Sequence, residues 1–330
     1  MTRRVLITGS SGFIGGHVLS AARAADDVRL RLLVRTPPAT PDPDVEYVHG
    51  DLTAPASLHG VCADVDAVVH CAGRIGGDAD LLRRANDLGT HALTREARRA
   101  GVARFVYLST AAVHGRGPFR DARPGEVPLA PASDTSRTRA AAEEHVLAAG
   151  GTVLRPHLVH GRGDRWVVPG ILALLRALGG LPDGWAGLQS MIDADTLGRV
   201  AFAAATTAPA DGAPADGAGS VHYVVHPDPV PGELLLSTVA QTFGLFTEGA
   251  PRVPADTARQ RVHDNPAARH HLGMLASDHW FTDELLWSGL GVAPGEGFAA
   301  RFTEYADWYR GQAGLPPLEA GHRLRTADIG

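Results

Sequence analysis

Three glycines near the N-terminus, Gly9, Gly12 and Gly15, recur at every third position. They follow the apolar run 5–7 and precede a segment with the apolar spacing of a helix. A strand, a glycine turn and a helix in this order let the backbone approach a pyrophosphate at the helix N-terminus. A glycine-rich turn without a ligand is the alternative. The candidate phosphate-binding residues are Gly9, Ser10, Ser11, Gly12, Phe13, Ile14 and Gly15.

Arg35 ends the second apolar run, about 20 residues after Gly15. Folds that bind NAD at such a turn place an acidic residue near this point, where it binds the ribose hydroxyls. An arginine there can instead bind a 2′-phosphate through two parallel hydrogen bonds. The sequence therefore predicts NADP(H) as cofactor, with a solvated surface arginine as the alternative.

The elements that must position these residues alternate along the first half of the chain. Short apolar runs are separated by helix-length segments, notably 81–100 and 137–149. Unbroken apolar strands between helices are typical of a parallel sheet covered on both faces. We predict an α/β fold with a doubly wound, Rossmann-like parallel sheet. The predicted strands of this part are residues 5–7, 28–34, 45–48, 67–69, 105–108 and 152–154.

The second half is less regular and suggests a smaller C-terminal lobe. We predict a dinucleotide-binding domain over 1–165, with a returning segment near 190–226, and a substrate-binding lobe over 166–189 and 227–330. The repeated Ala-Pro-Ala-Asp-Gly within 208–219 predicts a solvated connector. Further elements are expected near 171–178, 196–207, 221–225, 233–243 and 298–309.

The composition limits the classes of binding partner and the cellular compartment that we expect for this protein. The chain has 330 residues, a net charge of −5, two cysteines and no lysine among its 31 basic residues. An acidic chain disfavours nucleic acid as a partner, because phosphate binding needs a basic face. Two cysteines disfavour a disulfide framework, which fits the cytoplasm. Pro169, Gly170 and Arg176 interrupt the apolar stretch 167–181, so we expect no membrane contact.

Polar side chains follow two predicted strands. Ser109 and Thr110 come directly after 105–108, which would bring their hydroxyls to the sheet edge where such folds bind ligands. Capping of the loop backbone is the alternative for both hydroxyls. Asp51 follows 45–48 and offers only acceptors, which suits an exocyclic amine, although a turn aspartate has the same position.

These segments resemble the extended short-chain dehydrogenase/reductases, a family related to nucleotide-sugar epimerases. Six segments in family order carry the resemblance: Thr8–Gly15, Gly50–Thr53, Val69–Gly73, Asn86–Thr90, Tyr107–Gly115 and Leu154–Asp164. The resemblance implies a nicotinamide-dependent oxidoreductase and a homodimer formed through the helices 81–100 and 137–149. It also implies these cofactor-binding residues: Arg35, Asp51, Leu52, Cys71, Ala72, Gly73, Arg74, Asn86, Leu108, Arg139, Pro156, Leu158 and Val159.

The sequence departs from this family at its catalytic pair. Reductases of the family use a tyrosine as proton donor and a lysine four residues later, but Thr135 and Arg139 occupy these positions here. The two side chains still share one helix face. A threonine hydroxyl is a far weaker acid than a phenol, whose pKa is about 10, and an arginine relays no proton. The candidate catalytic residues are Ser109, Thr110, Thr135 and Arg139.

Three functions fit this departure. The first is a ketoreductase that uses NADPH on an aromatic polyketide ketone and takes its proton from water or from a phenol of the substrate. The second is a non-catalytic NADP-binding regulator. The third is a nucleotide-sugar epimerase or dehydratase, which we rank last because such reactions begin by removing an alcohol proton.

Several remaining residues have two interpretations. His114 occupies a position where the family has a tyrosine, and His157 and His160 flank the expected nicotinamide segment. Each is a candidate acid, with an ordinary loop or supporting position as the alternative. No histidine pair has the spacing of a metal site. The residues expected to line the substrate pocket are Val113, His114, Trp166 and Met191. We expect Asp134 to act as a helix N-cap, with a substrate contact as the alternative. We expect Asp195 to cap a helix as well, although Asp193–Asp195 resembles the acidic segment that follows the substrate loop in the family.

Overall fold

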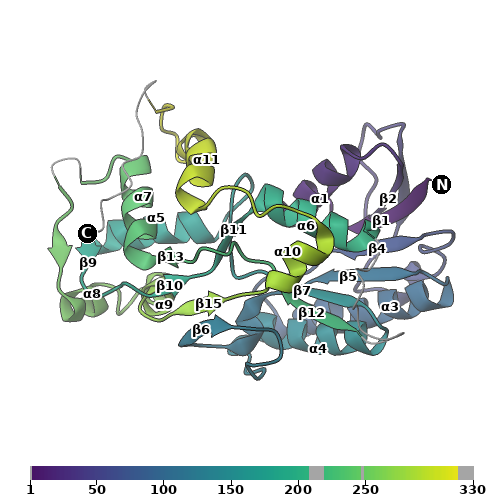
Figure 1. The fold of residues 1–330 in the computed structure, drawn as a ribbon, viewed down its shortest axis with the longest axis horizontal. Coiled ribbons are helices and arrows are strands. Elements are labelled where there is room, and N and C mark those ends of the chain that lie inside the picture. Colours follow the sequence, from purple (N-terminus) through teal and green to yellow (C-terminus); the bar gives the residue numbers. More distant parts are fainter. Residues whose placement is uncertain (1, 208–218, 247–248, 319–330) are drawn as a thin grey trace.

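The computed structural model describes residues 2–207, 219–246 and 249–318. Its main sheet has seven strands, all parallel, in the order β12-β7-β5-β4-β1-β2-β3 (Figure 1). The predicted α/β fold with a doubly wound parallel sheet is confirmed. The strands are β1 Arg3–Thr8, β2 Val28–Val34, β3 Val45–His49, β4 Ala67–His70, β5 Arg104–Leu108, β7 Thr152–Arg155 and β12 Ser220–Tyr223.

Helices cover both faces of this sheet, so its central strands are apolar on both sides. In β1, Val5 and Ile7 pack into the core beneath one helix layer, and Leu6 packs into the core beneath the other. All three side chains are fully buried. Figure 1 shows α1 and α6 on one face and α3 and α4 on the other. These helices are α1 Phe13–Arg23, α6 Ala194–Thr206, α3 Gly89–Arg99 and α4 Asp134–Ala148.

The direction of strand addition reverses beside β1. The chain runs outward through β2 and β3, then returns to place β4 on the other side of β1. Doubly wound sheets bind their ligands at this reversal, beyond the carboxyl ends of the strands. Thr8 and His70 are the last residues of the two strands that flank it.

The predicted helix 81–100 is divided into three pieces. Residues Arg83–Leu88 form a π-helical turn between α2, Ala79–Leu82, and α3. A π turn holds one extra residue per hydrogen-bonded ring, which rotates the side chains that follow it. Apolar spacing could not reveal this insertion, because the segments on both sides keep the helical period.

Both helix caps expected from the sequence are wrong by one or two positions. Ser133, not Asp134, caps α4, and Ser133 and Ser136 exchange hydrogen bonds in a capping box. Asp193, not Asp195, caps α6 and accepts a hydrogen bond from the Thr196 N–H. Asp195 lies in the first turn of α6, so its carboxylate is available for other contacts.

A second core lies in the C-terminal part of the chain, where aromatic and leucine side chains of several helices pack together. Figure 1 shows these helices beside the end of the main sheet. They are α5 Val167–Leu178, α7 Gly232–Thr242, α8 Ala255–Arg261, α9 Pro266–Leu275 and α11 Phe298–Gln312, while α10 is Glu284–Leu290. The short strands are β6 Phe119–Ala122, β8 Leu158–His160, β9 Leu181–Pro182, β10 Leu188–Gln189, β11 Met191–Asp193, β13 Val230–Pro231, β14 Arg252–Val253 and β15 His279–Phe281.

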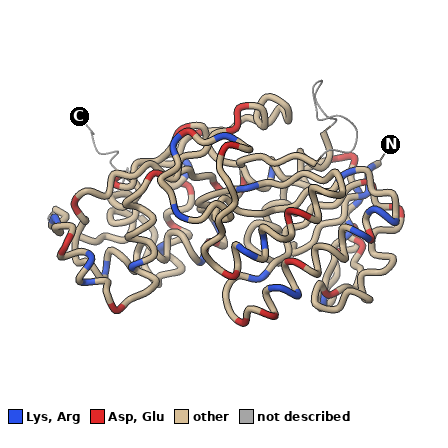
Figure 2. The backbone as a smooth tube through the Cα atoms, turned by 90° about the horizontal axis from the view of Figure 1, so that it is seen from below, with Lys and Arg blue, Asp and Glu red and all other residues tan. Residues whose placement is uncertain are grey.

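Residues 208–218 of the expected connector lie outside the described residues. Within the described ranges, no helix is long and apolar enough to cross a membrane. Figure 2 shows arginines interspersed with acidic residues along the length of the molecule.

Candidate active site

The glycine turn lies at the reversal of the sheet, where it packs against the segment after β4. Gly9 has φ +71°, and a Cβ there would lie 2.7 Å from the Ala72 nitrogen. A Cβ on Gly15 would lie 2.1 Å from the Gly9 carbonyl oxygen. Both positions therefore require glycine. Gly12 is the N-cap of α1 and has no side chain to satisfy the first N–H groups, so a phosphate fits this helix end.

His70 links the glycine turn to the central helix through a chain of hydrogen bonds. Its Nδ1 lies 2.6 Å from the Thr8 hydroxyl, which accepts from the Ala72 N–H, and its Nε2 lies 2.9 Å from the Thr90 hydroxyl. Thr90 donates its own hydrogen to the Asn86 carbonyl. The Thr90 oxygen must then accept from Nε2–H, so Nδ1 accepts from Thr8. Burial and the charge of Arg139 lower the pKa of His70 to about 3, which keeps the ring neutral.

Asn86 holds the segment that follows β4. Its Oδ1 accepts from the Arg74 N–H at 2.7 Å, and its Nδ2 donates to the Arg74 carbonyl at 3.1 Å and to the Thr138 hydroxyl at 3.0 Å. The side chain is buried, so it positions residues 72–74 through their backbone. Cys71 is half-buried, and burial raises the pKa of its thiol to about 12. A direct contact of these residues with a cofactor stays a prediction.

The residues expected at the adenine end lie at the carboxyl ends of β2 and β3. Asp51 Oδ1 accepts from the Thr53 N–H and hydroxyl, both at 2.8 Å. These bonds, aided by the positive charge of Arg35, lower the pKa of Asp51 and keep it charged. Arg35 is exposed directly after β2. Leu52 packs against α3, where a Cβ on Gly89 would lie 2.6 Å from the Leu52 Cβ.

The two hydroxyls after β5 have different surroundings. Ser109 is buried and donates to the carboxylate of Glu143, which also binds Arg155 through contacts of 3.0 and 2.5 Å. Thr110 is half-buried and accepts from the Ala112 N–H at 3.2 Å. Its hydroxyl hydrogen therefore remains available to a ligand, whereas that of Ser109 is used inside the protein.

Thr135 and Arg139 stand one turn apart on α4, as predicted, and each binds a different loop. The Thr135 hydroxyl accepts from the Gly76 N–H at 3.1 Å. Arg139 Nη1 donates to the Leu108 carbonyl at 2.8 Å, at the end of β5. A guanidinium has five N–H donors, so this contact leaves others for a ligand.

The expected nicotinamide segment runs beside these residues. The Ala111 N–H donates to the Pro156 carbonyl at 2.8 Å, which joins this segment to the loop after β5. Leu158 is buried in β8 and Val159 is half-buried. The structure thus brings the 156–159 segment close to the candidate catalytic hydroxyl of Thr110.

None of the three weighed histidines is a strong proton donor near neutral pH. Burial lowers the pKa of His114, and its Nε2 faces the Tyr223 hydroxyl at 2.8 Å and Arg155 at 3.2 Å. Burial lowers the pKa of His157 to about 3 and that of His160 to about 4. All three rings are therefore neutral when a ketone would be reduced.

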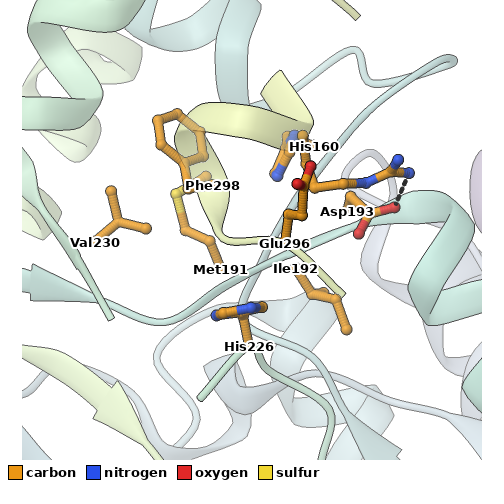
Figure 3. Close-up of a pocket in the computed structure, with 9 residues that line it drawn as sticks. His160, Met191, Ile192, Asp193, His226, Val230, Glu296 and Phe298 are labelled. Carbon is orange, nitrogen blue, oxygen red and sulfur yellow. Dashed lines mark hydrogen bonds and ion pairs between the residues drawn. The ribbon is translucent and has the colours of Figure 1, made fainter. Parts of the chain in front are cut away.

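The structure does not bring the four expected substrate residues together. Val113 and His114 are buried in the core, and Trp166 is 57% exposed before α5. Met191 lines a pocket with His160 and Phe298, shown in Figure 3. Its volume of about 10 Å³ suits a single water molecule rather than a polycyclic ketone.

Sequence reasoning missed one exposed apolar side chain beside the candidate catalytic pair. Ile75 is 54% exposed and directly precedes Gly76, which binds Thr135. The sequence signal for this residue is an isolated apolar side chain within an otherwise polar, glycine-rich stretch. The described residues contain no group of three or more His, Cys, Asp or Glu side chains arranged to hold a metal ion.

Comparison with known proteins gives a family match and full-length relatives. The NAD dependent epimerase/dehydratase family profile matches residues 5–176. A 2-alkyl-3-oxoalkanoate reductase from Stenotrophomonas maltophilia is 26% identical, covering 88% of this chain and 94% of that protein. A 4-hydroxy-2-methyl-3-oxo-4-farnesyl-3,4-dihydroquinoline-1-oxide ketoreductase from Stigmatella aurantiaca is 28% identical, covering 79% of each chain.

Solved structures share the whole architecture. The dTDP-glucose 4,6-dehydratase DesIV from Streptomyces venezuelae, solved with NAD bound, aligns with a TM-score of 0.69 at 23% identity. The alignment covers 94% of this chain and 98% of that one. At this identity the likeness establishes the fold.

Proposed function

The chain belongs to the NAD dependent epimerase/dehydratase family and is an NAD(P)-dependent oxidoreductase, and from this premise we propose that it is an NADPH-dependent ketoreductase. The observation that carries the proposal is the pair on α4. Thr135 contacts the 74–76 segment and Arg139 contacts the end of β5, each side chain has a hydrogen-bond donor left, and neither is a phenol. Such a site can stabilise a developing oxyanion, but it cannot supply the proton itself.

The glycine turn fits the dinucleotide that this activity needs. A Cβ at Gly9 or Gly15 would collide with the backbone that forms the turn. Gly12 leaves the N-terminus of α1 without a side-chain cap, so its first N–H groups suit a pyrophosphate. We propose NADP(H) rather than NAD(H), because Arg35 is exposed at the end of β2 and can bind a 2′-phosphate. When bound, the reduced cofactor supplies the hydride.

In the proposed reaction, the carbonyl carbon gains the hydride and the carbonyl oxygen gains the negative charge. The Thr110 and Thr135 hydroxyls and the Arg139 guanidinium would stabilise this charge, because each has a hydrogen left to donate. The proton comes from a phenol of the substrate or from water. The phenol O–H bond breaks, the alcohol O–H bond forms, and solvent returns a proton to the phenolate.

We propose an aromatic polyketide ketone, of the angucyclinone type, as the substrate in antibiotic biosynthesis. A phenol conjugated with the carbonyl would compensate for the missing tyrosine. The Stigmatella relative, whose name describes a ketone on a dihydroquinoline, supports a fused aromatic ring system. The absence of tyrosine and lysine from the α4 pair also resembles the angucyclinone ketoreductase of simocyclinone biosynthesis.

Absorbance of NADPH tests this function directly. We expect NADPH consumption with a phenolic polycyclic ketone and little with a simple aliphatic ketone. Tight NADPH binding without turnover of any ketone would support the regulatory alternative instead. Reduction of NADP⁺ by a nucleotide sugar would support the epimerase or dehydratase alternative.

We further propose a cytoplasmic homodimer. Cys62 and Cys71 are free thiols, which fits a reducing compartment. Leu88, the last residue of the π-helical turn before α3, is 37% exposed and offers an apolar contact for a second copy. Light scattering of the purified protein measures the mass of the assembly, and a monomer would contradict this part of the proposal.

A further inference from the structure

His17 joins three separate parts of the candidate cofactor site. It lies in α1, one turn after Phe13, at the end that faces the glycine turn. Its Nδ1 lies 2.6 Å from Asp195 Oδ1 of α6, and its Nε2 lies 2.7 Å from the Arg162 carbonyl oxygen. Both partners are acceptors, so both ring nitrogens must carry a hydrogen to make both bonds. Only the imidazolium form has two N–H groups.

The charges around His17 favour this form. Asp195 and Asp193 face it from the start of α6, and the Asp195 carboxylate also accepts from the Tyr305 hydroxyl of α11 at 2.6 Å. Arg301 of α11 contacts the same carboxylate at 3.4 Å and is the opposing positive charge. Burial disfavours the charged ring, but the bonds to Asp195 and Arg162 outweigh it and raise the pKa of His17 above 6.5.

The Arg162 carbonyl belongs to the segment that is expected to frame the nicotinamide. Next to it, a Cβ on Gly163 would lie 2.9 Å from the Phe13 ring, so this segment packs on the start of α1. Tyr309 of α11 accepts from the Gly161 N–H at 2.8 Å and donates to Asp164 at 3.0 Å. Protonated His17 therefore ties the pyrophosphate end of the site to its nicotinamide end.

We propose that His17 is a positioning residue for the nicotinamide dinucleotide and makes its binding depend on pH. Below the pKa that His17 has in the folded protein, its ring donates to both Asp195 and the Arg162 carbonyl. Above it, the ring loses one N–H, so one of its two acceptors faces a lone pair and the link between Asp195 and the 161–164 segment is weakened. Affinity for the dinucleotide is then highest at low pH and falls as pH rises. The inference rests on the proposed function only in requiring that a nicotinamide dinucleotide binds.

Titration calorimetry with NADP⁺ across pH tests the proposal. Because a charged hydrogen bond is lost, we expect the affinity to fall by roughly tenfold or more through the transition. His17→Gln should bind weakly at low pH and show a flat profile. Asp195→Asn should move the transition to lower pH, because the ring loses its anionic partner. The exposed His263 provides the control variant His263→Gln, which should match the parent protein.

Two further measurements separate the possible causes. NAD⁺ measured in parallel has no 2′-phosphate, so a transition common to both nucleotides belongs to the protein and not to the phosphate, whose pKa is about 6. Nitrogen-15 NMR of the imidazole should show two protonated nitrogens at low pH. Identical pH profiles for the parent protein, His17→Gln and Asp195→Asn would overturn the inference. Failure of both nucleotides to bind at any pH would refute the proposed function, while a neutral His17 ring at low pH would refute the inference alone.

Discussion

The Thr135 hydroxyl oxygen accepts a hydrogen bond of 3.1 Å from the backbone N–H of Gly76. This contact orients the hydroxyl at the position where the family resemblance predicts a tyrosine. One lone pair is used by the protein, and the hydroxyl hydrogen remains free to donate. Thr135 can therefore bind a carbonyl oxygen, but its high intrinsic pKa prevents it from giving up the proton.

Thr135→Val should reduce turnover only moderately. The variant loses one neutral hydrogen bond to the developing oxyanion, worth about 0.5–1.5 kcal/mol, so kcat should fall about threefold to tenfold. Steady-state kinetics with NADPH and a phenolic ketone measures the change. A loss of all activity in a folded variant would mean that Thr135 does transfer the proton.

Arg35→Asp should weaken NADPH binding far more than NADH binding. The variant lacks the guanidinium that would bind the 2′-phosphate, and its new carboxylate would repel this phosphate. The loss in binding free energy should be at least about 1.5–3 kcal/mol. Binding constants for both nucleotides check this. Arg29→Asp, at the opposite end of β2 and also exposed, is the matched control. Equal losses for NADPH and NADH would contradict the assignment of Arg35.

A substrate whose phenol is masked as a methyl ether should be reduced much more slowly. The ether has no proton to give to the alkoxide, and burial keeps the rings of His114, His157 and His160 neutral near neutral pH. Rates for the phenol and its ether should be compared at saturating concentrations. Unchanged rates would indicate water or a protein group as the donor.

Glu143→Gln should destabilise the protein strongly. Glu143 forms a buried ion pair with Arg155 and accepts from Ser109, and removing one charge leaves the other unpaired in the core. We expect a loss of about 3–5 kcal/mol in the free energy of unfolding, measured with denaturant. Its neighbour Glu144 is exposed, so Glu144→Gln should change stability by less than about 0.5 kcal/mol. Similar stability of both variants would show that the ion pair is not needed.

Acid should destabilise the protein through its neutral histidines. Burial lowers the pKa of His157 from 6.5 to about 3, so between these values the unfolded chain binds a proton that the folded chain does not. This contribution to stability is complete above about pH 6.5 and is lost as pH falls. Among the described residues, His157 Nε2 is buried without a hydrogen-bond partner, so His157→Phe removes the titration without breaking a hydrogen bond at this atom. Its stability should depend less steeply on pH between 3 and 6.5 than that of the parent protein, as measured by thermal unfolding. Equal slopes would contradict this assignment.

Local patterns determined much of the nucleotide-binding half. The predicted strand 28–34 coincides with β2, whose leucines Leu30, Leu32 and Leu33 are buried between the two helix layers. The glycine turn was also readable, since Gly9 and Gly15 are required by local close approaches that no other residue permits. The one-turn spacing of Thr135 and Arg139 followed from the period of the helix. Each of these inferences depends on residues close together in the chain.

Tertiary structure alone decided how the polar groups are used. Ser109 follows a strand in the expected way, yet its hydroxyl binds Glu143 in the core instead of facing a ligand. His17 and Asp195 lie 178 residues apart, and only the packing of α1 on α6 brings them within 2.6 Å. Spacing along a chain specifies which side chains share an element, but hydrogen-bond partners and burial depend on which distant element lies opposite. For this reason the sequence by itself determined the fold and the glycine turn, while the roles of its histidines and buried carboxylates were decided by the folded protein.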